Sequence, residues 1–171
     1  AVVVFISLTT LHTELRRVME PRTSPPAARL ATIRDLARAG IPVGVLTAPM
    51  IPGLNDHELP QLLAAAADAG ARFAGYVTLR LPYQNKELFT QWLAEHFPLK
   101  QEKVLARIRA VREGDLNNAE FGSRMRGSGL FAEQIEKLFE VGCRKAGLNR
   151  EPLELSTAAF RRPGGVQMEL L

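Results

Sequence analysis

The chain has 171 residues, a formal net charge of +4 and one cysteine, Cys143. This length is enough for one domain with a sizeable core, and the 46% hydrophobic and 23% charged content is typical of a soluble globular protein. One cysteine excludes an internal disulfide and a metal site built from cysteines alone. No apolar run approaches the roughly 20 residues of a membrane helix and no signal peptide is visible, so we expect a cytoplasmic protein without a membrane partner.

The chain begins with an almost wholly apolar segment, residues 1–8. This composition predicts a strand buried on both faces, as in parallel sheets. Such a strand needs neighbours at its edges, so we expect the sequence to belong to a longer protein whose missing N-terminal half supplies them. A short amphipathic turn or helix is expected over residues 9–18. A Pro-rich connector then leads to a helix with Ser24 as its N-cap and Gly40 after its end.

A second apolar strand is predicted from Ile41, and a helix beginning between residues 56 and 60 leads from it to Gly70. A third strand is predicted over residues 73–81. The Ala-Gly pairs that precede the second and third strands lie 30 residues apart, close to the repeat of about 31 residues in a β/α barrel. Three parallel strands cannot close a barrel. We therefore predict the α/β fold class, with residues 1–82 forming the back part of a partial TIM-like (β/α)6 barrel.

Residues 83–171 have a different character and predict a helical C-terminal extension that packs on the barrel part. Amphipathic helices are expected over residues 87–97, 101–112 and 130–145, because apolar residues recur there at three- and four-residue spacing. The tail from Glu151 is expected to pack back as an extended segment.

Polar residues follow the first two predicted strands, at the sheet edge where parallel α/β folds bind ligands. They are Ser7, Thr9, Thr10, Thr47, Asn55 and Asp56. The hydroxyl groups after the first strand suit a ribose or a carboxylate, but capping of a following turn is the alternative. For Asn55 and Asp56, the alternative is the N-cap of the next helix.

Charged residues at the strand ends are the next candidates. Arg80 ends the third apolar run, where an unpaired charge is costly, so it meets an acid such as Glu20 or receives a ligand carboxylate or phosphate. Glu20 and Arg22 flank Pro21 near the same edge, and a surface turn with incidental charges is the alternative for them.

Arg124 and Arg126 precede a Gly-Ser-Gly stretch that opens a predicted helix. Guanidinium groups beside free backbone N–H groups form an anion seat, and the alternative is an ordinary loop with Ser128 as a cap. His12, His57 and His96 lack metal-ligand spacing, so no metal site is predicted and we expect them in loops or on helix surfaces. Cys143 is expected to be a core thiol.

Several stretches, in this order, resemble the later half of radical S-adenosylmethionine (SAM) proteins of the spore photoproduct lyase group, also described as DNA-repair-photolyase-like. Residues 5–10 read Phe-Ile-Ser-Leu-Thr-Thr, residues 19–25 Met-Glu-Pro-Arg-Thr-Ser-Pro, and residues 47–50 Thr-Ala-Pro-Met. The likeness continues through residues 76–82 and 121–129.

The resemblance implies a [4Fe–4S] cluster and SAM in the intact protein, with reductive cleavage of SAM to a 5′-deoxyadenosyl radical that abstracts hydrogen from a substrate. The cluster-binding Cys-x3-Cys-x2-Cys loop of the family is absent from this sequence, so we expect the segment alone to be inactive and without cofactor. By position, Ser7 and less directly Thr9 would touch the ribose or methionine part of SAM. The segment from Val45 through Thr47 to Pro49 would line the adenine, and Arg80 would lie near a carboxylate.

Two other readings use no catalysis by this chain. The Arg-rich helical region could bind a nucleic acid, in line with the mild basic charge. The chain could also be an interaction module without a cofactor. The residues do not identify the substrate, and DNA as the target follows from the family likeness and the mild basic charge.

Overall fold

The computed structural model describes residues 2–156 and 158 of the chain. The strands β1 (Val4–Ser7), β2 (Val43–Met50) and β3 (Phe73–Thr78) form a three-stranded parallel sheet in the order β1-β2-β3. Ile6 pairs with Val45, which in turn pairs with Ala74. The chain is therefore an α/β protein with the predicted parallel strands, consistent with part of a TIM-like barrel, and the opening apolar segment lies beside the second strand as expected.

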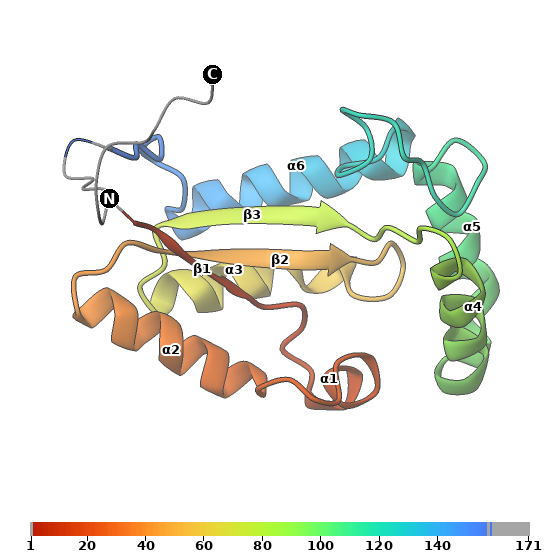
Figure 1. Cartoon of the computed structure of the whole chain (residues 1–171), viewed down its shortest axis with the longest axis horizontal. Coiled ribbons are helices and arrows are strands. Elements are labelled where there is room, and N and C mark those ends of the chain that lie inside the picture. The colour runs from red at the N-terminus through yellow and green to blue at the C-terminus, as the bar shows by residue number, and fades with distance from the viewer. Residues whose placement is uncertain (1, 157, 159–171) are drawn as a thin grey trace, which may run out of the picture.

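Helices α2 (Pro26–Arg38), α3 (Leu59–Asp68) and α6 (Gly129–Ala146) lie on one side of this sheet (Figure 1). The larger hydrophobic core fills the space between them and includes Ile33, Val45, Leu63, Tyr76 and Phe139. It forms because β2 is apolar on its helix-facing side and each helix has an apolar stripe.

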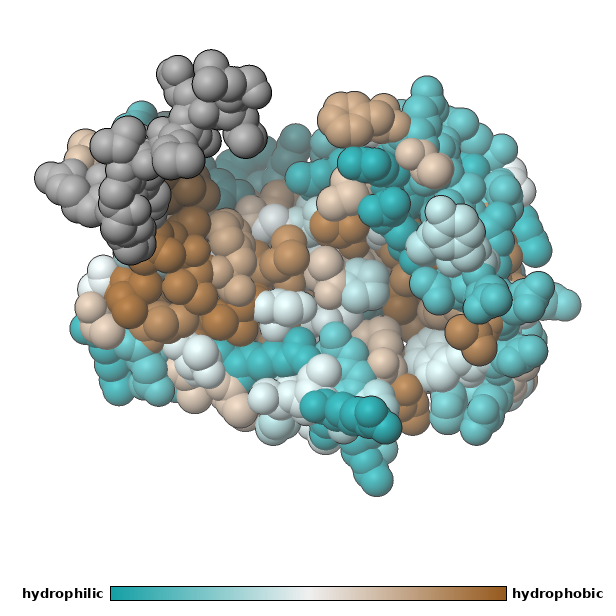
Figure 2. Space-filling model, in the orientation of Figure 1, coloured by the Kyte–Doolittle hydropathy of each residue, from teal (hydrophilic) through white to brown (hydrophobic). Residues whose placement is uncertain are grey.

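The other face of the sheet carries no helix within the described residues. An added Cβ at Gly44 would lie 2.5 Å from the Phe5 ring and 3.0 Å from the Cβ of Phe73, so these three residues share that face. Phe5 is 41% exposed. Figure 2 shows a hydrophobic surface on the side of the sheet that faces the viewer. One face of the sheet is thus covered and the other is open.

Three further helices stand at the carboxyl ends of the strands: α1 (Thr13–Met19), α4 (Asn85–His96) and α5 (Gln101–Val111). Figure 1 shows α4 and α5 across the tips of the strand arrows. A second core cluster lies here, with Leu15, Ile51, Leu79, Leu93 and Ile108 buried in it. Short 3₁₀ helices, η1 (Asp56–Glu58) and η2 (Pro98–Lys100), precede α3 and α5. Among the described residues, no helix has the length and hydrophobicity needed to cross a membrane.

Several predicted boundaries hold and one cap is wrong. Gly40 and Gly147 follow their helices with φ of +73° and +72°, a left-handed conformation that glycine adopts without strain. Pro25 rather than Ser24 is the N-cap of α2, and the Ser24 carbonyl instead accepts a hydrogen bond from Arg29 Nε at 3.0 Å. Residues 151–156 have no regular structure, and the rest of the predicted tail (157 and 159–171) lies outside the described residues.

Candidate functional site

A pocket of about 350 Å³ opens at the carboxyl ends of β2 and β3. Its wall is largely apolar, with Val18, Met19, Pro49, Phe89 and Trp92 among the lining residues. Arg80 is the charged residue in this lining. The pocket therefore suits an organic ligand with an apolar body and an anionic group.

Arg80 has no carboxylate partner among the described residues. Its Nη1 lies 3.8 Å from the Met125 sulfur, and its buried Nε has no hydrogen-bond partner. The predicted pairing with Glu20 is wrong, because Glu20 is bound elsewhere. Of the two predicted roles for Arg80, the receipt of a ligand anion stays open as a prediction, and the geometry leaves the guanidinium free for it.

Arg112 holds the end of β3 in place and was missed in the sequence analysis. This side chain is 1% exposed. Its Nη2 donates to the carbonyls of Thr78 and Leu79 at 3.0 and 2.7 Å, and its Nη1 donates to those of Ser123 and Arg124 at 3.3 and 2.9 Å. Burial, and secondarily the nearby charge of Arg80, lowers the pKa of the Arg112 guanidinium. Arg112 thus fixes the backbone immediately before Arg80.

Glu20 belongs to a second hollow, of about 430 Å³, beside the end of β1. Arg29 Nη2 donates to Glu20 Oε2 at 2.8 Å, and Arg29 Nη1 donates to the Ser7 carbonyl at 2.9 Å. The hydroxyl of Thr9 lies 3.1 Å from Glu20 Oε1 and 3.2 Å from the Ala48 carbonyl. Ser7 and Glu20 therefore line one hollow and are joined by Arg29. Arg22 is exposed and lies outside this lining.

A buried polar network ties the end of β1 to the start of α3. Asn55 is fully buried; its amide donates to the carbonyls of Thr9 and Pro49 at 3.0 and 3.1 Å, and its Oδ1 accepts the Ile51 N–H at 2.7 Å. Asn55 occupies the N-cap position of η1, as the capping alternative predicted, but its side chain makes no cap hydrogen bond and joins the two loops instead. The Thr10 hydroxyl donates to the Glu58 carboxylate at 2.8 Å. The network fixes the positions of both strand-end loops.

Two of the predicted adenine-side residues do not reach the open edge with their side chains. Val45 and Thr47 are both 0% exposed and lie on the helix-facing side of β2. The Thr47 hydroxyl donates to the Gly75 carbonyl at 3.0 Å. The side chains of Val45 and Thr47 are thus buried against the helices in this structure, and lining of the adenine by this segment stays a prediction. Pro49 lines the Arg80 pocket instead.

The two arginines of the predicted anion site each lie over a different aromatic ring. The guanidinium of Arg124 lies 5.0 Å from the centre of the Phe121 ring, and that of Arg126 lies 3.8 Å from the centre of the Tyr76 ring. Ser128 is the N-cap residue of α6, as the capping alternative predicted, but its hydroxyl makes no cap hydrogen bond and instead lies 3.1 Å from Glu113 Oε1. Anion binding by the two arginines stays a prediction.

Cys143 lies in the core between α3 and α6, where it is 6% exposed. Burial raises the pKa of its thiol to about 11. A protonated, buried thiol is a poor nucleophile and a poor metal ligand. The expectation of a core thiol is confirmed.

Comparison with known proteins gives matches to part of the chain. An uncharacterized protein of Mycobacterium tuberculosis is 38% identical over 97 residues, which is 56% of this chain and 28% of the relative, and one of Mycobacterium bovis gives the same values. An uncharacterized protein of Acidianus two-tailed virus is 39% identical over 74 residues, covering 40% of this chain and 25% of that protein. The matched part is thus about a quarter of the length of these relatives.

No solved structure matches the chain. The family comparison covers β1, β2 and the helices up to most of α3. Residues 1–66 match the model of the Radical SAM superfamily, the superfamily that the sequence resembles.

Proposed function

We propose that this chain is the later part of the β/α barrel of a radical SAM enzyme, in which its strand ends bind part of SAM or the substrate. The observation that carries the proposal is the Arg80 guanidinium, which has an unpartnered Nε and no carboxylate partner among the described residues, in an apolar pocket at the carboxyl ends of strands. The superfamily match includes β2, one of the two strands that lead to this pocket, and β1 beside it. In parallel α/β folds, this edge is where ligands bind.

The two edges of the sheet differ, and this difference indicates the edge to which the remaining strands of the barrel would add. The edge of β3 is capped, because the Asn149 side chain bonds the Ala74 N–H and carbonyl at 2.8 and 3.0 Å and the Met125 carbonyl accepts the Thr78 N–H at 2.9 Å. β1 pairs with β2 alone among the described strands. Further strands would therefore add beside β1 and would also cover the open, Phe5-bearing face. We assign them to the N-terminal half of the same protein.

The residues of this chain do not fit an iron–sulfur cluster. Such a cluster is held by cysteine thiolates, and Cys143 is the one cysteine in the sequence, protonated and buried in the core. In the proposed enzyme the ligands lie in a Cys-x3-Cys-x2-Cys loop outside these 171 residues. The chain alone is then inactive in SAM cleavage.

The pocket does fit the organic cofactor or a substrate with a carboxylate. Arg80 would bind that carboxylate, with Pro49 and Trp92 contacting an apolar or ring portion of the ligand. Ser7 and Glu20, held by Arg29, offer oxygen atoms for ribose hydroxyl groups. SAM, when bound beside a reduced cluster, supplies the radical chemistry. The part played by this chain is binding, orientation and exclusion of water.

Within the superfamily, we propose membership of the spore photoproduct lyase group on the likeness of residues 19–25 and 47–50. A nucleic-acid substrate is part of this proposal. It is supported by the net charge of +4 and by the exposed Arg126 and half-buried Arg124 of the loop before α6.

The test compares these 171 residues with a longer natural protein that contains them behind a Cys-x3-Cys-x2-Cys loop. Both are reconstituted anaerobically with iron and sulfide, reduced and supplied with SAM. The longer protein should bind about four irons per cluster and release 5′-deoxyadenosine, whereas the shorter chain should do neither. An Arg80→Ala change in the longer protein should raise the KM for SAM or substrate at unchanged iron content, and Arg109→Ala on the exposed side of α5 is the control. Iron uptake without SAM cleavage would overturn the proposal.

A further inference from the structure

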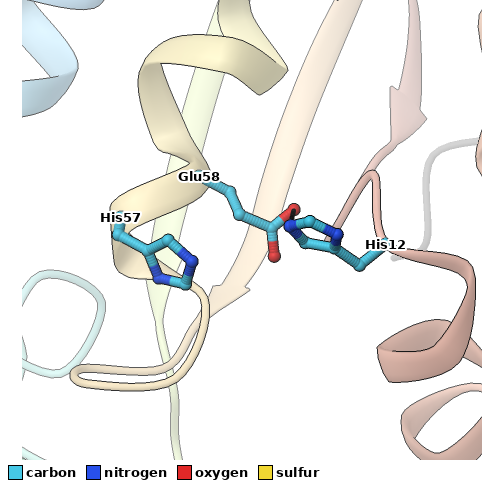
Figure 3. A group of neighbouring side chains, drawn as sticks. All are labelled: His12, His57 and Glu58. Carbon is cyan, nitrogen blue, oxygen red and sulfur yellow. Dashed lines mark ion pairs between the residues drawn. The ribbon is translucent and has the colours of Figure 1, made fainter.

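Outside the pockets, the structure brings together three side chains with metal-binding chemistry: His12, His57 and Glu58. His12 immediately precedes α1, and the other two belong to η1. One ligand atom from each lies within 4.8 Å of the other two. Figure 3 shows the Glu58 carboxylate between the two imidazole rings. Two strand-end loops, 45 residues apart in the sequence, thus meet at one point.

We propose that these three residues bind a divalent transition-metal ion of the Zn²⁺ type. Two imidazole nitrogens and one carboxylate oxygen are a ligand set that Zn²⁺ uses in sites with an open fourth position. Soft thiolate-binding ions are disfavoured because the set has no sulfur, and Mg²⁺ and Ca²⁺ because both prefer oxygen ligands.

The geometry is close to what such an ion needs. Ligand distances of 2.0–2.2 Å in a tetrahedron separate the ligand atoms by about 3.4 Å. His12 Nε2 and Glu58 Oε2 are already 3.8 Å apart. The largest separation, within 4.8 Å, closes by side-chain rotation, because the His12 side chain is 64% exposed and His57 is also exposed. Metal entry therefore requires no movement of the backbone.

Glu58 is the fixed member of the set. Its side chain is 1% exposed, and its carboxylate accepts the Thr10 hydroxyl at 2.8 Å and the Leu11 N–H at 2.9 Å. A carboxylate has about four acceptor sites, so lone pairs stay available beside His12. Hydrogen-bonded support of this kind orients a ligand before the metal arrives. Because both histidines are exposed, water could occupy the remaining coordination position.

The site is separate from the Arg80 pocket, and its ligands differ in kind from those of an iron–sulfur cluster. None of its residues lines that pocket, and its ligand set contains no cysteine. It bridges the loop after β1 and the turn before α3, so bound metal would reinforce the link already made by Thr10 and Glu58.

The chain has three histidines, which makes the test direct. Purified 171-residue chain, stripped of metal, is titrated with Co²⁺ while the histidine ring signals are followed by NMR. Signals of His12 and His57 should broaden together at substoichiometric Co²⁺, and that of His96 in α4 should not. In Zn²⁺ titration calorimetry, His12→Gln and His57→Gln should each weaken binding at least tenfold, and His96→Gln should change it less than twofold.

His12 and His57 are both exposed, so their glutamine variants should keep the fold. Unchanged circular dichroism spectra check this. Glu58→Gln, which retains the shape of the side chain, should also weaken Zn²⁺ binding at least tenfold. Equal broadening of all three histidine signals would overturn the site. Zn²⁺ binding that is unchanged by His12→Gln or by His57→Gln would also overturn it. Because this readout needs neither SAM nor iron, it is independent of the proposed enzyme activity.

Discussion

Replacement of Arg112 by methionine should destabilise the fold more than any surface substitution. The guanidinium makes four hydrogen bonds of 2.7 to 3.3 Å to backbone carbonyls while it is 1% exposed. Methionine fills a similar volume but donates no hydrogen bond, so the carbonyls of Thr78, Leu79 and Arg124 lose this donor. The Ser123 carbonyl keeps the Gly127 N–H, at 2.6 Å.

The magnitude follows from the carbonyls that lose their partner. Each buried acceptor without a partner costs about 1–3 kcal/mol, which gives roughly 2–6 kcal/mol for the buried Thr78 and Leu79 carbonyls. The Arg124 carbonyl is only partly buried and adds less. Part of this loss is offset, because methionine also removes the free-energy cost of burying a cation that has no carboxylate partner. We therefore expect the free energy of unfolding to fall by about 3–4 kcal/mol. Arg112→Lys should lose nearly as much, because an ammonium group has three donors and cannot span carbonyls from two segments.

Urea denaturation followed by circular dichroism measures the effect. Arg109→Met, on the exposed side of the same helix, is the matched control and should change the free energy of unfolding by less than about 0.5 kcal/mol. A loss below about 1 kcal/mol for Arg112→Met would refute the reasoning, since it would mean that water or rearranged backbone replaces the guanidinium without cost.

Three further outcomes are expected in the same assay. Asn55→Ala should cost about 2–4 kcal/mol because it removes three buried hydrogen bonds, whereas exposed Asn85→Ala should cost less than about 0.5 kcal/mol; equal losses would contradict the network. Gly44→Ala should cost about 1–3 kcal/mol, because its Cβ would lie 2.5 Å from an aromatic ring. Gly75→Ala should cost less, since the nearest neighbour of its added Cβ is a leucine methyl at 3.3 Å. A larger loss of stability for Gly75→Ala than for Gly44→Ala would contradict this reasoning. The raised pKa of Cys143 gives stability that is complete below its unfolded pKa, near 9, and is lost as pH rises through about 11. Between pH 9 and 11, the free energy of unfolding of the native chain should therefore fall by about 2 kcal/mol more than that of Cys143→Ala. If the two proteins lose stability in parallel over this range, titration of Cys143 is not the cause.

The three parallel strands could be predicted because their composition indicates burial on both faces. Residues 1–8 and the run after Ile41 are apolar on both faces, and glycines at positions 40, 70 and 147 end helices with positive φ. These are local signals, and local signals survive folding when the packing agrees with them.

The side-chain partners could not be predicted, because they depend on distances between loops. Arg29 and not Arg80 reaches Glu20, since α2 runs back beside the end of β1. Thr47 sits near a strand end but points to the helices, because side chains alternate along a strand and the second strand begins at Val43. The meeting of His12 with Glu58 depends on two loops that no sequence spacing relates.

Trp92 allows ligand binding in the Arg80 pocket to be followed by fluorescence. It is the single tryptophan of the chain, and its indole N–H donates to the Val18 carbonyl at 3.0 Å while its ring lines the pocket. Its intrinsic fluorescence therefore originates from the wall that a ligand would touch. A change in emission on addition of a small carboxylate would report occupancy without any label, and loss of the response in Arg80→Ala would assign it to that guanidinium.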